Sequence, residues 1–116
     1  MNNAKEMVKL IYQALEDKKA EDIEVIDIAE VSCLADYFII THGENSNQVQ
    51  AMADSVDEAM TKAGFTCRGV EGYQAAHWIL LDYSDVVVHV FSGDDRRFYD
   101  LSRIWRDGKT VDINEI

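Results

Sequence analysis

The 116-residue sequence has no proline, only two cysteines, and half as many basic residues as acidic ones. Lys and Arg number 11 against 22 Asp and Glu, which gives a formal net charge of −11. A chain this acidic repels phosphate backbones, so we expect no direct, specific binding of nucleic acid. A basic protein is the natural partner because complementary fields speed encounter, although such a charge also serves solubility alone.

Long apolar runs are missing as well. Nothing approaches the ~18–20 residues of a membrane span, and no charged-then-apolar signal segment begins the chain, so we expect a cytoplasmic protein that contacts no membrane. Cys33 and Cys67 are isolated rather than spaced as CxxC and are expected to be free thiols. Without internal repeats or linkers, residues 1–116 predict a single domain, in which 109–116 form a loosely ordered tail.

Catalytic motifs are also scarce. Neither cysteine has a histidine nearby in the sequence, and no Gly-rich phosphate loop occurs. A nucleotidyltransferase would need a Gly-Ser loop and two Asp residues on one strand to hold two metals. This chain has Gly43-Glu44 and no Asp-x-Asp. We therefore predict no enzymatic activity, no catalytic residues and no cofactor, with a nucleotidyltransferase-like, metal-dependent enzyme as the alternative.

Hydrophobic periodicity predicts the order of the secondary-structure elements. Helices are expected over residues 1–18, 46–63 and 94–107, and strands over 22–28, 37–41 and 65–70, followed by a hairpin over 78–91. The one strong crossover surrounds the second helix, so strands 37–41 and 65–70 should run parallel, whereas the hairpin is antiparallel. The fold class is therefore α/β, with a mixed, mostly five-stranded sheet flanked by helices.

The hairpin organises the chain. Two apolar runs rich in β-branched residues flank a polar break at Tyr83-Ser84. A two-residue loop there would place Asp82 opposite Asp85 and Trp78 opposite His89. Because side chains alternate across a strand, one face of the hairpin is almost purely apolar and is expected to lie in the core. Its members are Ile79, Leu81, Val86, Val88 and Val90.

The second face of the hairpin mixes large apolar side chains with titratable ones. It carries Trp78, Leu80, Asp82, Asp85, Val87, His89 and Phe91. Mixed faces with a large aromatic residue are where partners bind; the alternative is a helix that covers this face, with both aspartates as solvated turn residues. Another alternative is a Mg²⁺ ion bound by Asp82 and Asp85, with Asp36 and Asp94 nearby. Aspartates at a tight turn more often form the turn, so we predict no metal site.

Taken together, these residues follow a recognisable order. It comprises Leu34-Ala35-Asp36-Tyr37-Phe38-Ile39-Ile40, Gly43, Glu71-Gly72, Trp78, Asp82, Asp85, Val88-His89, Phe91, Arg97, Tyr99, Leu101 and Trp105. This order resembles the ribosomal silencing factor family, also called Iojap-like. Ser84 stands where that family usually has glycine, Ser102 replaces a usual glutamate, and Glu44-Asn45-Ser46 differs from the usual small-residue loop.

The resemblance implies a nucleotidyltransferase-like fold and a binding role. Such proteins dock on protein L-fourteen of the large ribosomal subunit, block joining of the small subunit and so repress translation when nutrients are short. They are commonly homodimers when free. We accordingly predict a partner-binding surface made of Trp78, Leu80, Asp82, Asp85, Val87, His89, Glu71 and Tyr99.

Overall fold

The computed structural model describes residues 4–30, 35–93 and 109–113, and the structural statements below concern these residues. The elements are α1 (Ala4–Asp17), β1 (Glu21–Asp27), β2 (Tyr37–Gly43), α2 (Ser46–Lys62), β3 (Gly69–Glu71), β4 (Trp78–Asp82), β5 (Val86–Ser92) and β6 (Lys109–Val111). The helix predicted over 94–107 lies outside the described residues. Neither described helix is long and apolar enough to cross a membrane.

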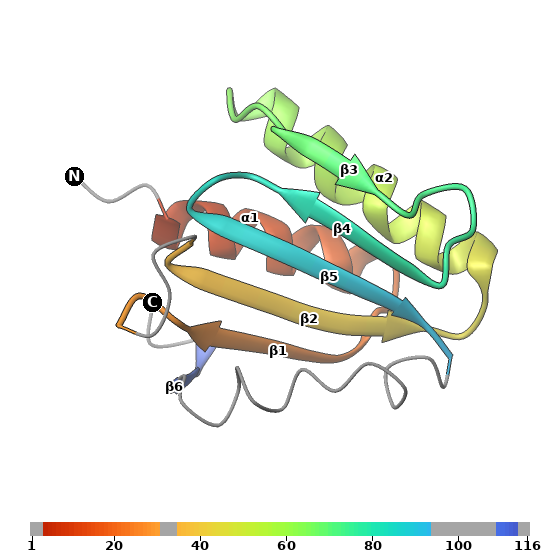
Figure 1. Cartoon of the computed structure of the whole chain (residues 1–116), viewed down its shortest axis with the longest axis horizontal. Helices are drawn as coiled ribbons and strands as arrows, with labels where there is room; N and C mark the ends of the chain where they lie inside the picture. The colour runs from red at the N-terminus through yellow and green to blue at the C-terminus, as the bar shows by residue number, and fades with distance from the viewer. Residues whose placement is uncertain (1–3, 31–34, 94–108, 114–116) are drawn as a thin grey trace.

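All six strands belong to one mixed sheet, in the order β3-β4-β5-β2-β1-β6 (Figure 1). Strands β2 and β5 pair in parallel, and every other neighbouring pair is antiparallel. The α/β class and the mixed sheet are thus confirmed, with six strands instead of five. The additional strand is β6: where the sequence predicted a loose tail, Lys109–Val111 pairs with β1.

Strand β3 differs from its prediction in length and position. It has three exposed residues at the edge of the sheet, instead of a strand over residues 65–70 beside β2. It does run in the same direction as β2, but β4 and β5 lie between them. The central place beside β2 goes to β5, because both strands are nearly continuous apolar runs, which suits a parallel pair covered on both faces.

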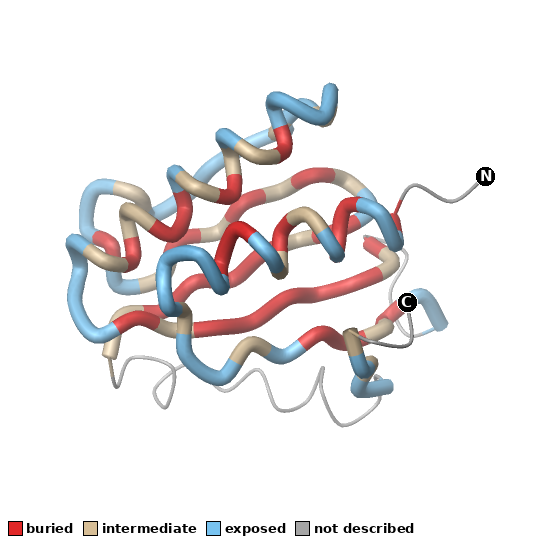
Figure 2. Tube along the Cα trace, turned by 180° about the vertical axis from the view of Figure 1, so that it is seen from behind, coloured by how far each residue is buried: buried red, intermediate tan, exposed pale blue. Residues whose placement is uncertain are grey.

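Both helices cover the same face of the sheet (Figures 1 and 2). The apolar residues that recur at three- and four-residue spacing are buried throughout, namely Ala4, Met7, Val8, Ile11 and Leu15 in α1 and Val49, Met52, Ala53, Val56 and Met60 in α2. They pack in one core cluster with Ile79, Leu81, Val86, Val88 and Val90, the predicted core face of the hairpin. The predicted core face of the hairpin is therefore confirmed, and it packs against the apolar sides of both helices.

Helix α2 begins and ends where its sequence predicts. The Asn45 side chain accepts a hydrogen bond of 2.9 Å from the backbone N–H of Gln48, which satisfies one of the free donors of the first turn. At the other end Gly64 adopts a φ of 91°, and the N–H of Phe65 returns to the carbonyl of Met60. The left-handed conformation after a helix favours glycine because no Cβ is in the way.

Candidate partner-binding face

The strands of the hairpin pair two residues away from the predicted register. The observed pairs are Trp78–Phe91, Ile79–Val90, Leu80–His89, Leu81–Val88 and Asp82–Val87. The predicted pairs, including Trp78 with His89, are therefore wrong. Side chains alternate with a period of two, so a shift of two residues leaves every side chain on its predicted side of the sheet.

The turn between the strands explains the shift. The N–H of Tyr83 donates to the carbonyl of Val86 at 3.0 Å, so the tight turn consists of Ser84 and Asp85. Ser84 has a φ of 71°, a conformation that favours glycine, which accounts for the glycine expected there. Its N–H donates to Oδ1 of Asp82 at 2.8 Å. Asp82 therefore helps to form the turn and does not lie opposite Asp85, which is exposed.

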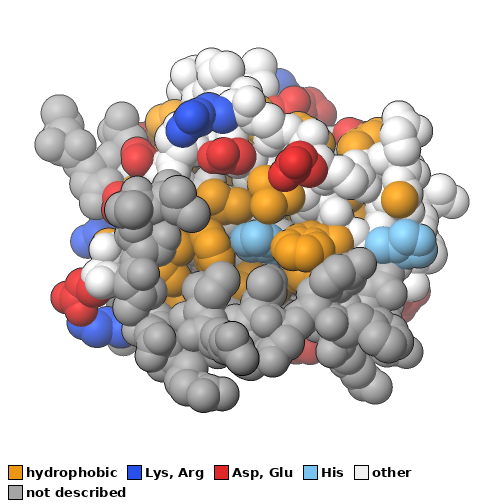
Figure 3. All heavy atoms as spheres, viewed as in Figure 1, with side chains coloured by type: hydrophobic (Ala, Val, Ile, Leu, Met, Phe, Trp, Pro, Cys, Tyr) orange, Lys and Arg blue, Asp and Glu red, His pale blue; other side chains and the backbone are white. Residues whose placement is uncertain are grey.

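The side of the sheet away from α1 and α2 carries most of the predicted partner-binding residues. We call this surface the hairpin face, and define it as Glu71, Trp78, Leu80, Asp82, Val87, His89 and Phe91. Figure 3 shows hydrophobic side chains gathered around a histidine there, with acidic side chains along one border. Glu71 joins it because it pairs with Leu80. Asp85 lies in the adjoining turn, and Tyr99 lies outside the described residues.

Strand β2 extends the apolar part of this face, which the sequence reasoning missed. Phe38 pairs with Val87 and Ile40 with His89, so their side chains share this side of the sheet. A second buried cluster results, made of Ile26, Ile28, Ala35, Phe38, Ile40 and Phe91, with Trp78 and Val87 packed against it. The available signal was the unbroken apolar run over residues 37–41, which is typical of a strand buried on both faces.

Trp78 is half-buried and has a defined orientation on the hairpin face. Its ring stacks on Phe91, with centroids 5.2 Å apart and planes inclined by 27°. Its Nε1–H donates a hydrogen bond of 3.1 Å to Nδ1 of His89. The stacked ring and the directional hydrogen bond together restrict how the indole can turn.

His89 is the one buried titratable group of this face, with 4% of its surface exposed. Loss of hydration lowers the pKa of its imidazole from 6.5 to about 4, so the ring is neutral at pH 7. Because an indole N–H can only donate, Nδ1 must be unprotonated and the proton lies on Nε2. That Nε2–H is buried and has no hydrogen-bond partner among the described residues. Such an unsatisfied donor typically costs about 1–3 kcal/mol.

Gly72 lies directly against the backbone of Trp78. Its φ is 79°, and a Cβ added there would lie 2.1 Å from the Trp78 carbonyl oxygen. The Gly72 carbonyl accepts the N–H of Ala76 at 2.9 Å, which closes the loop between β3 and β4. The spacing between Glu71-Gly72 and Trp78 thus has a geometric reason: only glycine allows the loop to pass so close to β4.

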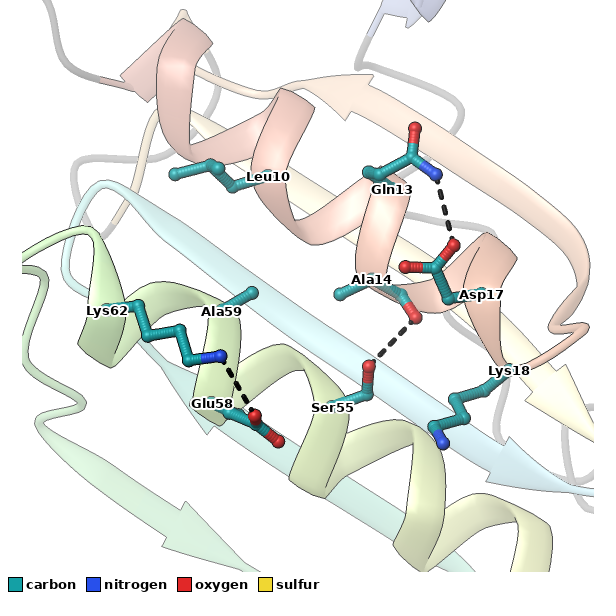
Figure 4. Close-up of a pocket in the computed structure, with 9 residues that line it drawn as sticks. All are labelled: Leu10, Gln13, Ala14, Asp17, Lys18, Ser55, Glu58, Ala59 and Lys62. Carbon is teal, nitrogen blue, oxygen red and sulfur yellow. Dashed lines mark hydrogen bonds and ion pairs between the residues drawn. The ribbon is translucent and has the colours of Figure 1, made fainter.

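A groove of about 360 Å³ lies on the opposite side of the molecule, between α1 and α2 (Figure 4). Its polar side chains are largely paired with neighbouring groups. Lys62 contacts Glu58 at 3.2 Å, and the Ser55 hydroxyl donates to the carbonyl of Ala14. The Ser55 hydrogen bond joins the two helices, whereas the Lys62–Glu58 pair lies within α2. The groove offers no activated nucleophile.

The described part of the chain contains no cluster of side chains that could bind the magnesium ion considered above. There, no three His, Cys, Asp or Glu side chains lie close enough together to hold a metal ion. Asp82 is partly engaged with the turn, and Asp94 lies outside the described residues. The described hairpin face is instead an apolar centre bordered by carboxylates, an arrangement suited to binding a protein surface.

Known proteins share both this sequence and this fold. A family model described as "Ribosomal silencing factor during starvation" matches residues 1–116. The ribosomal silencing factor RsfS of Bacillus subtilis is 40% identical over 112 residues, which cover 97% of this chain and 95% of that protein. The RsfS of Halalkalibacterium halodurans is 39% identical over 111 residues, 96% of this chain and 95% of that protein.

Solved structures of similar sequence have the same fold. A crystal structure from Chromobacterium violaceum matches with a TM-score of 0.87 and 37% identity, over 94% of this chain and 90% of that one. One from Bacillus halodurans matches with a TM-score of 0.83 and 38% identity, over 92% of this chain and 97% of that one. The resemblance seen in the sequence is therefore confirmed, and the chain belongs to the ribosomal silencing factor family.

Proposed function

We propose that this chain binds the large ribosomal subunit through protein L-fourteen, blocks joining of the small subunit and thereby represses translation in the cytoplasm. The names of its relatives support a ribosomal silencing role. The observation that carries the proposed site is the orientation of Trp78, stacked and hydrogen-bonded at the apolar centre of the hairpin face. Aromatic residues in such positions contribute most of the binding energy at protein interfaces.

The charge of the face suits a basic ribosomal protein. Glu71 is exposed and Asp82 half-buried at its border, on a chain of net charge −11. Carboxylates there would meet Lys or Arg side chains of the partner and steer its approach. Tyr99 remains a proposed member of the surface. We also propose a homodimer in the free state and a binding role without catalytic turnover.

Trp78→Ala tests the proposed site. Removing the central aromatic side chain should weaken binding to purified large ribosomal subunits by at least about 2 kcal/mol. Co-sedimentation through a sucrose gradient should then be lost, while circular dichroism shows a folded domain. Val70→Ala is the matched control, because Val70 is 46% exposed on β3 but pairs with Leu81, on the other side of the sheet.

Two outcomes would contradict the proposed site. If Trp78→Ala unfolds the domain, Trp78 belongs to the core and the hairpin face is a covered surface. If the variant stays folded and binds large subunits as tightly as the Val70→Ala control, docking takes place elsewhere.

Asp82→Asn tests the role of the acidic border. Asparagine keeps an oxygen that can accept the Ser84 N–H, so the turn should persist while one charge is removed. We expect slower association with the large subunit at low salt and a weaker dependence of the rate on salt. Asp17→Asn removes the same charge from α1, beside the groove on the other side, and should leave the rate nearly unchanged. Equal effects of both variants would mean that only net charge matters.

A further inference from the structure

We infer that His89 is a positioning residue for partner binding: Nδ1 of its neutral imidazole holds the Trp78 indole in the orientation that meets the partner. This inference rests on the proposed function, because it concerns the same surface. The contribution of Trp78 to the binding energy would then depend on its hydrogen bond to Nδ1 of His89. The partner would therefore meet an indole whose orientation is already set.

The imidazole itself is held firmly enough to set that orientation. It belongs to β5, which lies between β4 and β2 in the sheet. The ring of Phe38 packs against it from β2, with centroids 4.7 Å apart and planes at 65°. Trp78 lies on its other neighbouring strand, with ring centroids 5.8 Å apart. Because the acceptor is fixed in place, the hydrogen bond that the indole donates to it also restricts the orientation of the indole.

The free-energy cost of burying the His89 imidazole supports a role for this residue beyond packing. Burying its Nε2–H without a partner among the described residues is unfavourable, and an apolar side chain of similar size would avoid that penalty. An apolar side chain would, however, leave the Trp78 Nε1–H without its acceptor. The feature that distinguishes histidine from leucine at this position is therefore the Nδ1 lone pair, which Trp78 uses.

A fixed indole should bind more tightly than a mobile one. A side chain that is already immobilised loses less conformational entropy when a partner covers it. Histidine at position 89 would then contribute to affinity without touching the partner. The same argument predicts that its replacement affects binding more than folding, as is common where a functional site carries local strain or an unsatisfied group.

The experiment compares His89→Leu, His89→Asn and Trp78→Phe in binding to purified large ribosomal subunits. His89→Leu removes the acceptor and should weaken binding about tenfold, with a thermal midpoint no lower than that of the wild type. Asn places an oxygen close to the position of Nδ1 and should recover most of the affinity. Trp78→Phe keeps an aromatic ring without the N–H, and combining it with His89→Leu should give no further loss attributable to the hydrogen bond.

A direct readout comes from the indole N–H signals in ¹⁵N–¹H NMR spectra. The chain has two tryptophans, and Trp78→Phe identifies which signal belongs to Trp78. In the wild type this N–H should exchange slowly with solvent; in His89→Leu it should exchange faster and shift, and in His89→Asn it should stay protected. An unchanged signal in His89→Leu would overturn the inference.

The outcomes separate this inference from the proposed function. If Trp78→Ala abolishes binding but His89→Leu and Trp78→Phe bind as tightly as the wild type, the surface is right and the positioning role is wrong. If Trp78→Ala itself binds normally, the proposed surface fails, and the positioning role fails with it. Should His89→Leu not fold, Trp78→Phe decides alone, since it removes the same hydrogen bond from the other partner.

Discussion

Gly72→Ala is expected to lower the free energy of unfolding by about 2–5 kcal/mol, the sum of a left-handed backbone penalty and an overpacking penalty. The φ of 79° disfavours any side chain, and the new Cβ would lie 2.1 Å from the carbonyl oxygen of Trp78. No rotamer change relieves this clash, because the neighbouring atom belongs to the backbone. The loop must therefore move away from β4, which also displaces Trp78 on the hairpin face.

Gly69→Ala is the matched control for this substitution. Gly69 begins β3, the short strand that ends one residue before Gly72; its φ is not positive, and nothing lies within 4 Å of the Cβ position. Its replacement should change stability by no more than about 0.5 kcal/mol. Urea denaturation followed by circular dichroism measures both variants, and co-sedimentation with large subunits measures the effect on binding. Similar midpoints for Gly72→Ala and Gly69→Ala would show that the close approach at Trp78 is not needed.

The second large effect is a loss of stability in mild acid. His89 has a pKa of about 4 in the folded protein, against 6.5 for an exposed histidine. Between these values the unfolded chain binds a proton that the folded chain does not, so stability falls as the pH falls from 6.5 to about 4. The full effect of this one group is about 3 kcal/mol. Above pH 6.5 the residue is neutral in both states and contributes no pH dependence.

Chemical denaturation of the wild type and of His89→Leu at pH 7, 5.5 and 4 would isolate this effect. Carboxylates also titrate in this range, but both proteins contain the same ones, so the difference between the two curves reports on His89. We expect the stability of the variant relative to the wild type to increase steadily as the pH is lowered. Parallel curves would mean that the imidazole can be protonated in the folded state without penalty.

Much of the local structure followed from the sequence alone. The spacing of apolar residues by three and four identified the buried sides of α1 and α2, and the helix predicted over residues 46–63 matches α2 closely. The two faces of the hairpin were also predictable, even though its register was not. Helical and strand periodicities are properties of neighbouring residues, and a strand has only two sides to choose between.

For the candidate site, the sequence predicted which hairpin residues share one side of the sheet but not how they are arranged. Alternation alone placed Trp78, Leu80 and His89 on one face, yet the hydrogen bond from Trp78 to His89 depends on the observed register. That register is decided by Ser84, which takes a left-handed conformation that a serine seldom adopts. The contact between Gly72 and the backbone of Trp78 likewise depends on the three-dimensional course of the loop between β3 and β4, which the sequence did not predict.

The amino-acid sequence by itself determined the α/β class, the buried sides of α1, α2 and the hairpin, and the acidic character of the surface. Only the tertiary structure decided which strands are neighbours: β5 beside β2, β3 at one edge, and β6 on β1 at the other. Pairing joins residues far apart in the chain, and several arrangements satisfy the same local pattern. The choice among them depends on how whole faces pack, which no short stretch of sequence contains.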